Sequence, residues 1–177
     1  MVPPALSNYF LATAGAGATL IGLLFVAVSI APEQIATRRA PLERQAVAAS
    51  TFTALVNAFF VSLGALLPGS LGWMALLMSS LGLLNSLALG GHLLRHPKSW
   101  QNFLRRVFLI LTSLAIYGAE FYYALRLTIT SSAVDSAYSL AGLLLAVYGV
   151  GLIRAWELLG VNRFGLLSWL NPCYITL

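Results

Sequence analysis

Five long apolar segments, separated by short polar stretches, are the feature that most limits how this chain can fold. They cover about residues 9–31, 47–67, 71–94, 107–127 and 134–153. Each is close to the ~20 residues that an α-helix needs to cross the hydrocarbon core of a bilayer. Only helices and closed barrels satisfy the backbone polar groups in lipid, and no alternating strand pattern recurs here. The segments therefore predict an all-α bundle of five transmembrane helices.

The composition favours lipid over water as the main solvent of the chain. Hydrophobic residues make up 59% of the 177 residues and charged residues only 8%, against about 25% in soluble domains. A water-soluble fold of this size has too little interior to bury so much apolar surface. We predict one domain over residues 1–160. A short tail over 161–177 follows, lying in the cytoplasmic interface or packing against other spans or a partner.

The basic residues are concentrated in alternate loops, and this predicts the orientation. Nine of the ten lysines and arginines follow the first, third or fifth segment: Arg38, Arg39, Arg44, Arg95, Lys98, Arg105, Arg106, Arg154 and Arg163. Basic loops stay in the cytoplasm, so the N-terminus is expected outside and the C-terminus inside. Orientation also explains the net charge of +5 without nucleic acid as a partner. The compactness of the chain suggests a bacterial cytoplasmic (inner) membrane.

Small residues recur at helical spacing in several segments. Helices in lipid associate by close van der Waals contact, which small side chains permit. The first segment is small on nearly every face, so we expect protein around it, at the centre of the protomer or at a contact with a second copy. The candidate packing residues are Ala14, Gly15, Ala18, Gly22, Gly82, Ser86, Gly90, Gly142 and Ala146. Packing within one bundle and self-association are both compatible with this pattern.

Glu120 is the one acidic residue expected within the hydrocarbon. An ionised side chain there costs at least ~2.5 kcal/mol, so it must be paired, hydrated or protonated. It is either a cation or proton site facing a water-filled cavity or, if the segment is shifted by one turn, an interface residue beside Tyr122. The other candidates for a polar pathway are Asn57, Asn85, Thr13 and Thr19. For the two asparagines, an interhelical hydrogen bond is the alternative role.

The sequence carries no signature of an enzyme. A single cysteine excludes an intrachain disulfide, and no zinc, phosphate-loop or nucleophile-elbow motif occurs. We therefore expect no catalytic residue, no cofactor and no metal site. Arg154 and Glu157, three residues apart, predict an ion pair at the inner end of the fifth helix.

Two function classes fit this pattern. The leading hypothesis is a small self-associating membrane protein that forms a channel or transport path for ions or small solutes. The alternative is a structural or accessory subunit of a larger membrane complex, without a path of its own. In both cases the bilayer is the first partner, and copies of the chain or other membrane subunits are the second.

Overall fold

The computed structural model describes residues 4–30, 42–94, 100–130 and 134–158, and these form five α-helices. They are α1 (Pro4–Ile30), α3 (Leu42–Leu66), α4 (Leu71–Leu94), α5 (Trp100–Ile129) and α6 (Val134–Leu158). The described residues contain no strand, so the prediction of an all-helical fold with five helices is confirmed. The predicted tail and most of the loops on which the orientation rests lie outside the described residues.

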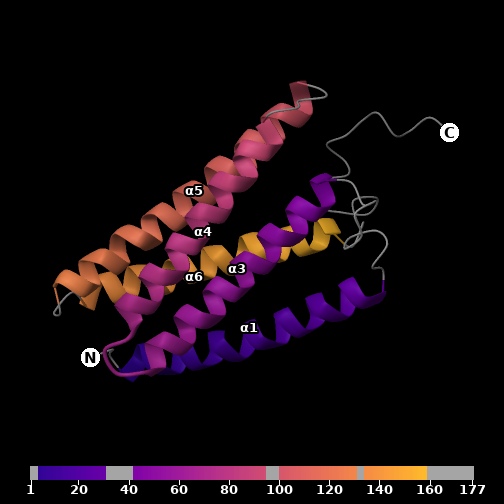
Figure 1. Cartoon of the computed structure of the whole chain (residues 1–177). Coiled ribbons are helices and arrows are strands. Elements are labelled where there is room, and N and C mark those ends of the chain that lie inside the picture. Colours follow the sequence, from indigo (N-terminus) through magenta and orange to yellow (C-terminus); the bar gives the residue numbers. More distant parts are fainter. Residues whose placement is uncertain (1–3, 31–41, 95–99, 131–133, 159–177) are drawn as a thin grey trace.

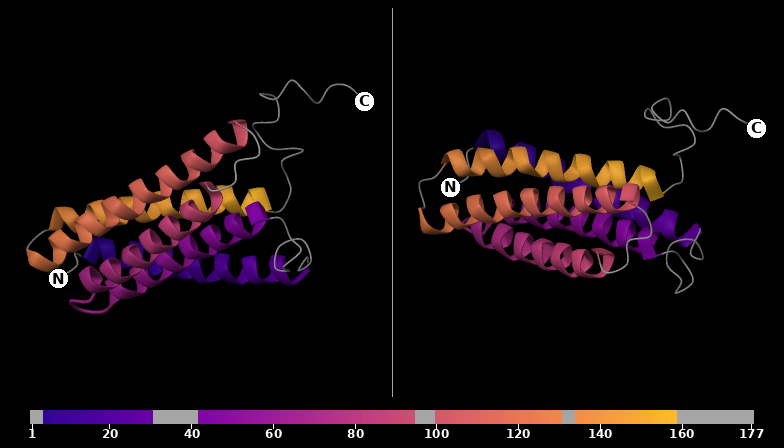
Figure 2. Two further views of the ribbon diagram at one scale, coloured as in Figure 1. Left: turned by 45° about the horizontal axis from the view of Figure 1, so that its top comes forward. Right: turned by 90° about the horizontal axis from the view of Figure 1, so that it is seen from above.

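The helices are arranged in three layers (Figure 1). α3 and α6 form the middle layer, α1 covers one side of it, and the α4–α5 pair covers the other. Two further views show all five helices running along the long direction of the bundle (Figure 2). Since α1 is an outer layer, the small-residue first helix does not lie at the centre of the protomer.

Four of the helices are long and apolar enough to cross a membrane, judged over the described residues. The stretches concerned are Leu6–Ile30, Gln45–Leu66, Leu71–Gly91 and Asp135–Trp156. α5 has 30 residues, and its crossing of the membrane remains a prediction. Apart from α4, the helices are longer than the predicted spans, and their helical backbone continues past the apolar run at one or both ends.

A tight turn joins α3 to α4, as the Pro-Gly-Ser sequence predicts. Gly69 has a φ of 77°, a conformation that glycine adopts without a steric penalty. The Ser70 N–H donates to the Leu67 carbonyl at 3.3 Å, and the Ser70 carbonyl accepts from the Met74 N–H at 2.9 Å as α4 begins. The turn is too short for any arrangement other than an antiparallel helical hairpin.

Small and polar side chains make up much of the interior of the bundle, beside a few large apolar ones such as Phe10 and Leu140, while many large apolar side chains lie outside. Buried residues of α3 include Thr51, Ala54, Ala58, Ser62 and Ala65. Exposed large side chains occur on every helix, among them Phe25, Phe60, Leu84, Phe108 and Ile153. A fold solvated by water buries its large apolar residues, while helices in lipid place small residues at their contacts. The distribution is consistent with a membrane location.

Candidate functional site

One face of α5 directs a row of polar side chains toward the other helices. Ser113, Tyr117 and Glu120 follow one another at spacings of four and three residues, and all are buried. Residues at these spacings share one face of a helix. The sequence of α5 thus brings a hydroxyl, a phenol and a carboxyl into line along the inner side of the bundle.

Glu120 and Asn57 meet at the α3–α5 contact. Glu120 is 0% exposed, and its Oε2 accepts a hydrogen bond of 2.8 Å from Nδ2 of Asn57, which is 2% exposed. Glu120 Oε1 and Asn57 Oδ1 have no hydrogen-bond partner in the part of the chain that the structure describes. A buried polar atom without a partner costs ~1–3 kcal/mol, so this pair calls for an explanation. Glu120 thus faces the interior of the bundle, while its depth in the membrane remains a prediction.

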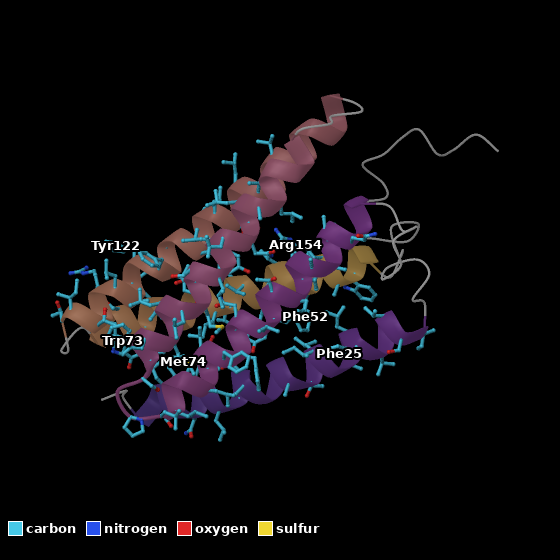
Figure 3. All side chains as sticks on the ribbon, in the orientation of Figure 1. Phe25, Phe52, Trp73, Met74, Tyr122 and Arg154 are labelled. Atoms are coloured by element: carbon cyan, nitrogen blue, oxygen red, sulfur yellow. The ribbon has the colours of Figure 1, made fainter. Side chains whose placement is uncertain are left out.

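Arg154 of α6 approaches the other end of the same row. Its side chain is 4% exposed, and Nη2 donates a hydrogen bond of 2.9 Å to Oγ of Ser113. Figure 3 shows this side chain between α6 and the α4–α5 pair. Tyr117 lies between Ser113 and Glu120 along α5 and is buried as well. Ser113 and Glu120 are separated by two turns, about 10 Å along the axis, so a basic and an acidic group mark the two ends of the row.

The remaining pathway candidates lie elsewhere. Oγ1 of Thr13 is 2.9 Å from Oγ of Ser62 across the α1–α3 contact. Nδ2 of Asn85 donates to Oγ1 of Thr53 at 3.0 Å, which joins α4 to α3. Thr19 lies on the exposed side of α1 and donates to the Gly15 carbonyl of its own helix at 2.9 Å. The structure therefore brings Glu120 and Asn57 together, but it does not align all five candidates along one path.

The small residues of α4 lie at a close helix contact. A Cβ added to Gly82 would lie 2.6 Å from Cδ1 of Tyr117, well inside contact distance. Ser86 is buried one turn further on, and a Cβ on Gly90 would lie 3.4 Å from Cγ2 of Ile110. This row accordingly lets α5 approach α4 closely and helps to position Tyr117 beside Glu120.

The small residues of α1 and α6 are mostly turned outward. Ala14 is buried, but the other predicted packing residues on these two helices are exposed: Gly15, Ala18, Gly22, Gly142 and Ala146. A Cβ added to Gly15, Gly22 or Gly142 would meet nothing within 4 Å. Within one protomer these positions make no close helix contact. Self-association through them remains a prediction.

The sequence interpretation missed the place of Arg154 in this row and the close contact at Gly17. The sequence predicts an ion pair of Arg154 with Glu157, whose side chain lies outside the described residues. The missed signal was the register of Arg154: Leu140, Leu144 and Val147 are buried on α6, and position 154 continues that face. At Gly17, α1 packs closely against the middle layer, because an added Cβ would lie 3.1 Å from Cβ of Phe59 in α3.

A cleft opens between α1 and α6 beyond their N-terminal halves. Tyr9 Oη donates to the Ala141 carbonyl at 2.7 Å, and Tyr148 Oη donates to the Thr13 carbonyl at 2.6 Å. Further along, a space of about 220 Å³ separates the two helices. Its lining includes Leu20, Leu24, Val28, Gly151, Leu152 and Trp156. The lining side chains are apolar, so this cleft suits hydrocarbon and offers nothing to an ion.

The similarity comparisons add no family to this picture. The chain matches no protein family model, no curated protein and no solved structure.

Proposed function

We propose that this chain is an integral membrane protein with five spans that moves ions or small solutes by way of the polar row between α3, α5 and α6. The observation that carries the proposal is the fully buried Glu120–Asn57 pair. Ionisable groups at membrane depth are expensive to place there, and they mark ion pathways and proton relays. Arg154, at the other end of the row, adds a second buried ionisable group.

The surface of the bundle supports placing it across a bilayer. Trp73 and Tyr122 are exposed toward one end of the bundle (Figure 3). Trp156 is exposed near the C-terminal end of α6, which lies toward the other end (Figure 1). Aromatic rings of this kind favour the two membrane interfaces. With five spans the two termini lie on opposite sides, and the basic loops put the N-terminus outside. We retain the bacterial inner membrane as the proposed location.

The site is closed in this structure, which favours a carrier over a standing pore. Glu120 and Asn57 have almost no exposed surface, so bulk water does not reach them in this conformation. A transported ion would reach the pair only after the helices around it move apart. The site would then face one side of the membrane at a time.

Ion flux into liposomes tests the proposal. The purified protein is reconstituted, and dyes inside the vesicles follow protons, sodium and potassium. We expect flux with the wild type and loss to the level of empty vesicles with Glu120→Gln, because the amide cannot exchange a charge. Asp135→Asn is the matched control: it makes the same chemical change at an exposed residue and should leave the flux intact. Equal flux in all three proteins, or none with folded wild type, would contradict the proposal.

A role as an accessory subunit is the second candidate, and the open face of α1 favours it. Gly15, Ala18 and Gly22 face outward and are exposed in the protomer, and small residues in lipid are typical of helix contacts. The same face would serve a second copy of the chain or an unrelated membrane subunit.

Leucines on this face should disrupt association without disturbing the protomer. We expect Gly15→Leu/Gly22→Leu to keep its helicity and stability but to lose partners, because the added side chains block close approach of another helix. Energy transfer between labelled copies in lipid measures self-association, and pull-down from native membranes detects other subunits. Gly91→Leu, at another exposed glycine with open space around it, is the control. Unchanged association in the double variant would show that another surface is used.

A further inference from the structure

Two buried oxygen atoms of the Glu120–Asn57 pair, Oε1 of Glu120 and Oδ1 of Asn57, accept no hydrogen bond from the described residues. We propose that Glu120 carries a proton on Oε1 and donates it in a hydrogen bond to Oδ1 of Asn57. The proposal deepens the function suggested above, since it names the proton as the ion that the site takes.

The argument starts from the donors and acceptors of the two groups. An ionised carboxylate only accepts hydrogen bonds, while a carboxamide has one accepting oxygen and an NH₂ that donates. One bond, from Asn57 Nδ2 to Glu120 Oε2, is already made at 2.8 Å. The two atoms left without a partner among the described residues are both acceptors, so they cannot bind one another. A proton on Oε1 supplies the missing donor and closes a ring of two hydrogen bonds between acid and amide.

The proton also removes the charge from a site that is closed to water. Glu120 is 0% exposed, and a buried charge is stable only when it is paired or well solvated by protein dipoles. A protonated carboxyl gains a donor and loses its charge in the same step. Both unsatisfied atoms and the burial thus have one explanation.

A metal ion fits this site less well than a proton. Hard cations such as Ca²⁺ and Mg²⁺ need about six oxygen ligands, and the pair has only its two unbonded oxygen atoms to offer. Among the described residues, no three His, Cys, Asp or Glu side chains are grouped as a metal site would require. A proton needs only the two atoms that are present.

The ionisable groups around Glu120 allow one competing state. Tyr117 on α5 and Arg154 on α6 are the other ionisable side chains of this row. α3 contributes the neutral Asn57. In the antiparallel α4–α5 pair, Gly72 approaches Thr128 and Gly82 approaches Tyr117. This register places Ser79 of α4, which carries a hydroxyl, near the level of Glu120. Arg154 is the cation of this row, and an ionised Glu120 balanced by it is the competing state.

Infrared spectroscopy separates the two states. The chain has five acidic residues, so a variant with Glu33, Glu43 and Glu157 changed to Gln and Asp135 changed to Asn keeps Glu120 as its one acidic side chain. In lipid at neutral pH we expect this variant to show the C=O stretching band of a protonated carboxyl. The band should disappear with Glu120→Gln. It should move to higher frequency with Asn57→Leu, because the carbonyl then loses its donor.

A folded protein without this band at neutral pH would overturn the proposal, since Glu120 would then be ionised. If the fourfold variant does not fold, the difference spectrum between wild type and Glu120→Gln gives the same reading. The flux assay remains separate. A band without flux would support the proton site and refute transport. Proton flux that is lost with Glu120→Gln, in a protein that shows no band, would support transport and refute the proton site.

Discussion

Asn57→Leu should lower the free energy of unfolding by about 1–3 kcal/mol, the cost of leaving a buried polar partner unsatisfied. Leucine has a similar size but no donor, so Glu120 Oε2 would lose the bond that it receives at 2.8 Å. With Glu120 0% exposed, water does not replace the lost donor. Reversible unfolding in mixed micelles, followed by circular dichroism, measures the change.

The double variant Asn57→Leu/Glu120→Leu provides the sharper half of this test. Replacing both partners of a buried hydrogen bond by apolar groups is close to neutral, so much of the stability should return. Asn85→Leu is the matched control, because Asn85 also bonds another helix but is only half-buried. If Asn57→Leu and Asn85→Leu lose equal stability, and the double variant recovers none of it, the Glu120–Asn57 bond does not contribute more to stability than the Asn85 bond.

Gly82→Ala should be among the most damaging small substitutions in the bundle. The new Cβ would lie 2.6 to 2.8 Å from three ring atoms of Tyr117, closer than a Cβ can approach another atom. α4 and α5 would have to separate, and overpacking of this kind costs ~1–3 kcal/mol. The movement would also displace Tyr117, which lies one turn from Glu120. Unfolding in micelles and the infrared band of Glu120 both report it.

Two other glycines provide a graded control. At Gly90 the added Cβ would be in ordinary contact with Ile110, at 3.4 Å, so a small effect is expected. At Gly142 nothing lies within 4 Å, and alanine should stabilise α6 by up to ~1 kcal/mol through its higher helix propensity. Similar stabilities for the alanine variants at 82 and 142 would mean that α4 and α5 are not packed as described.

The helices themselves were predictable because length and apolarity are enough to define them. The bounds of α4, Leu71–Leu94, agree with the predicted third segment, and the turn at Gly69 follows from the residues around it. Helix packing was harder to predict. When both faces of a helix are apolar, hydrophobicity does not distinguish the buried side from the lipid side. The outer position of α1 therefore could not be derived from its run of small residues.

The candidate site was predictable residue by residue but not as a pair. Glu120 and Asn57 each stood out as polar residues in apolar segments, yet 63 positions separate them in the chain. Nothing in either segment indicates which helix the other residue will contact. The buried position of Arg154 was not predicted, for a different reason. A basic residue near the end of a span is typical of a loop anchor, and only the register of the buried face of α6 argues otherwise.

The two tyrosine bonds between α1 and α6 have a structural consequence. Both reach α1 in its first half, at Tyr9 and Thr13, whereas the cleft lies along its second half. In its second half α1 is held by α3 and not by α6, since the rings of Phe25 and Phe52 meet edge to face with centroids 5.6 Å apart. The cleft is therefore a wedge-shaped apolar groove with Leu55 of α3 in its lining, closed at one end by the tyrosine bonds.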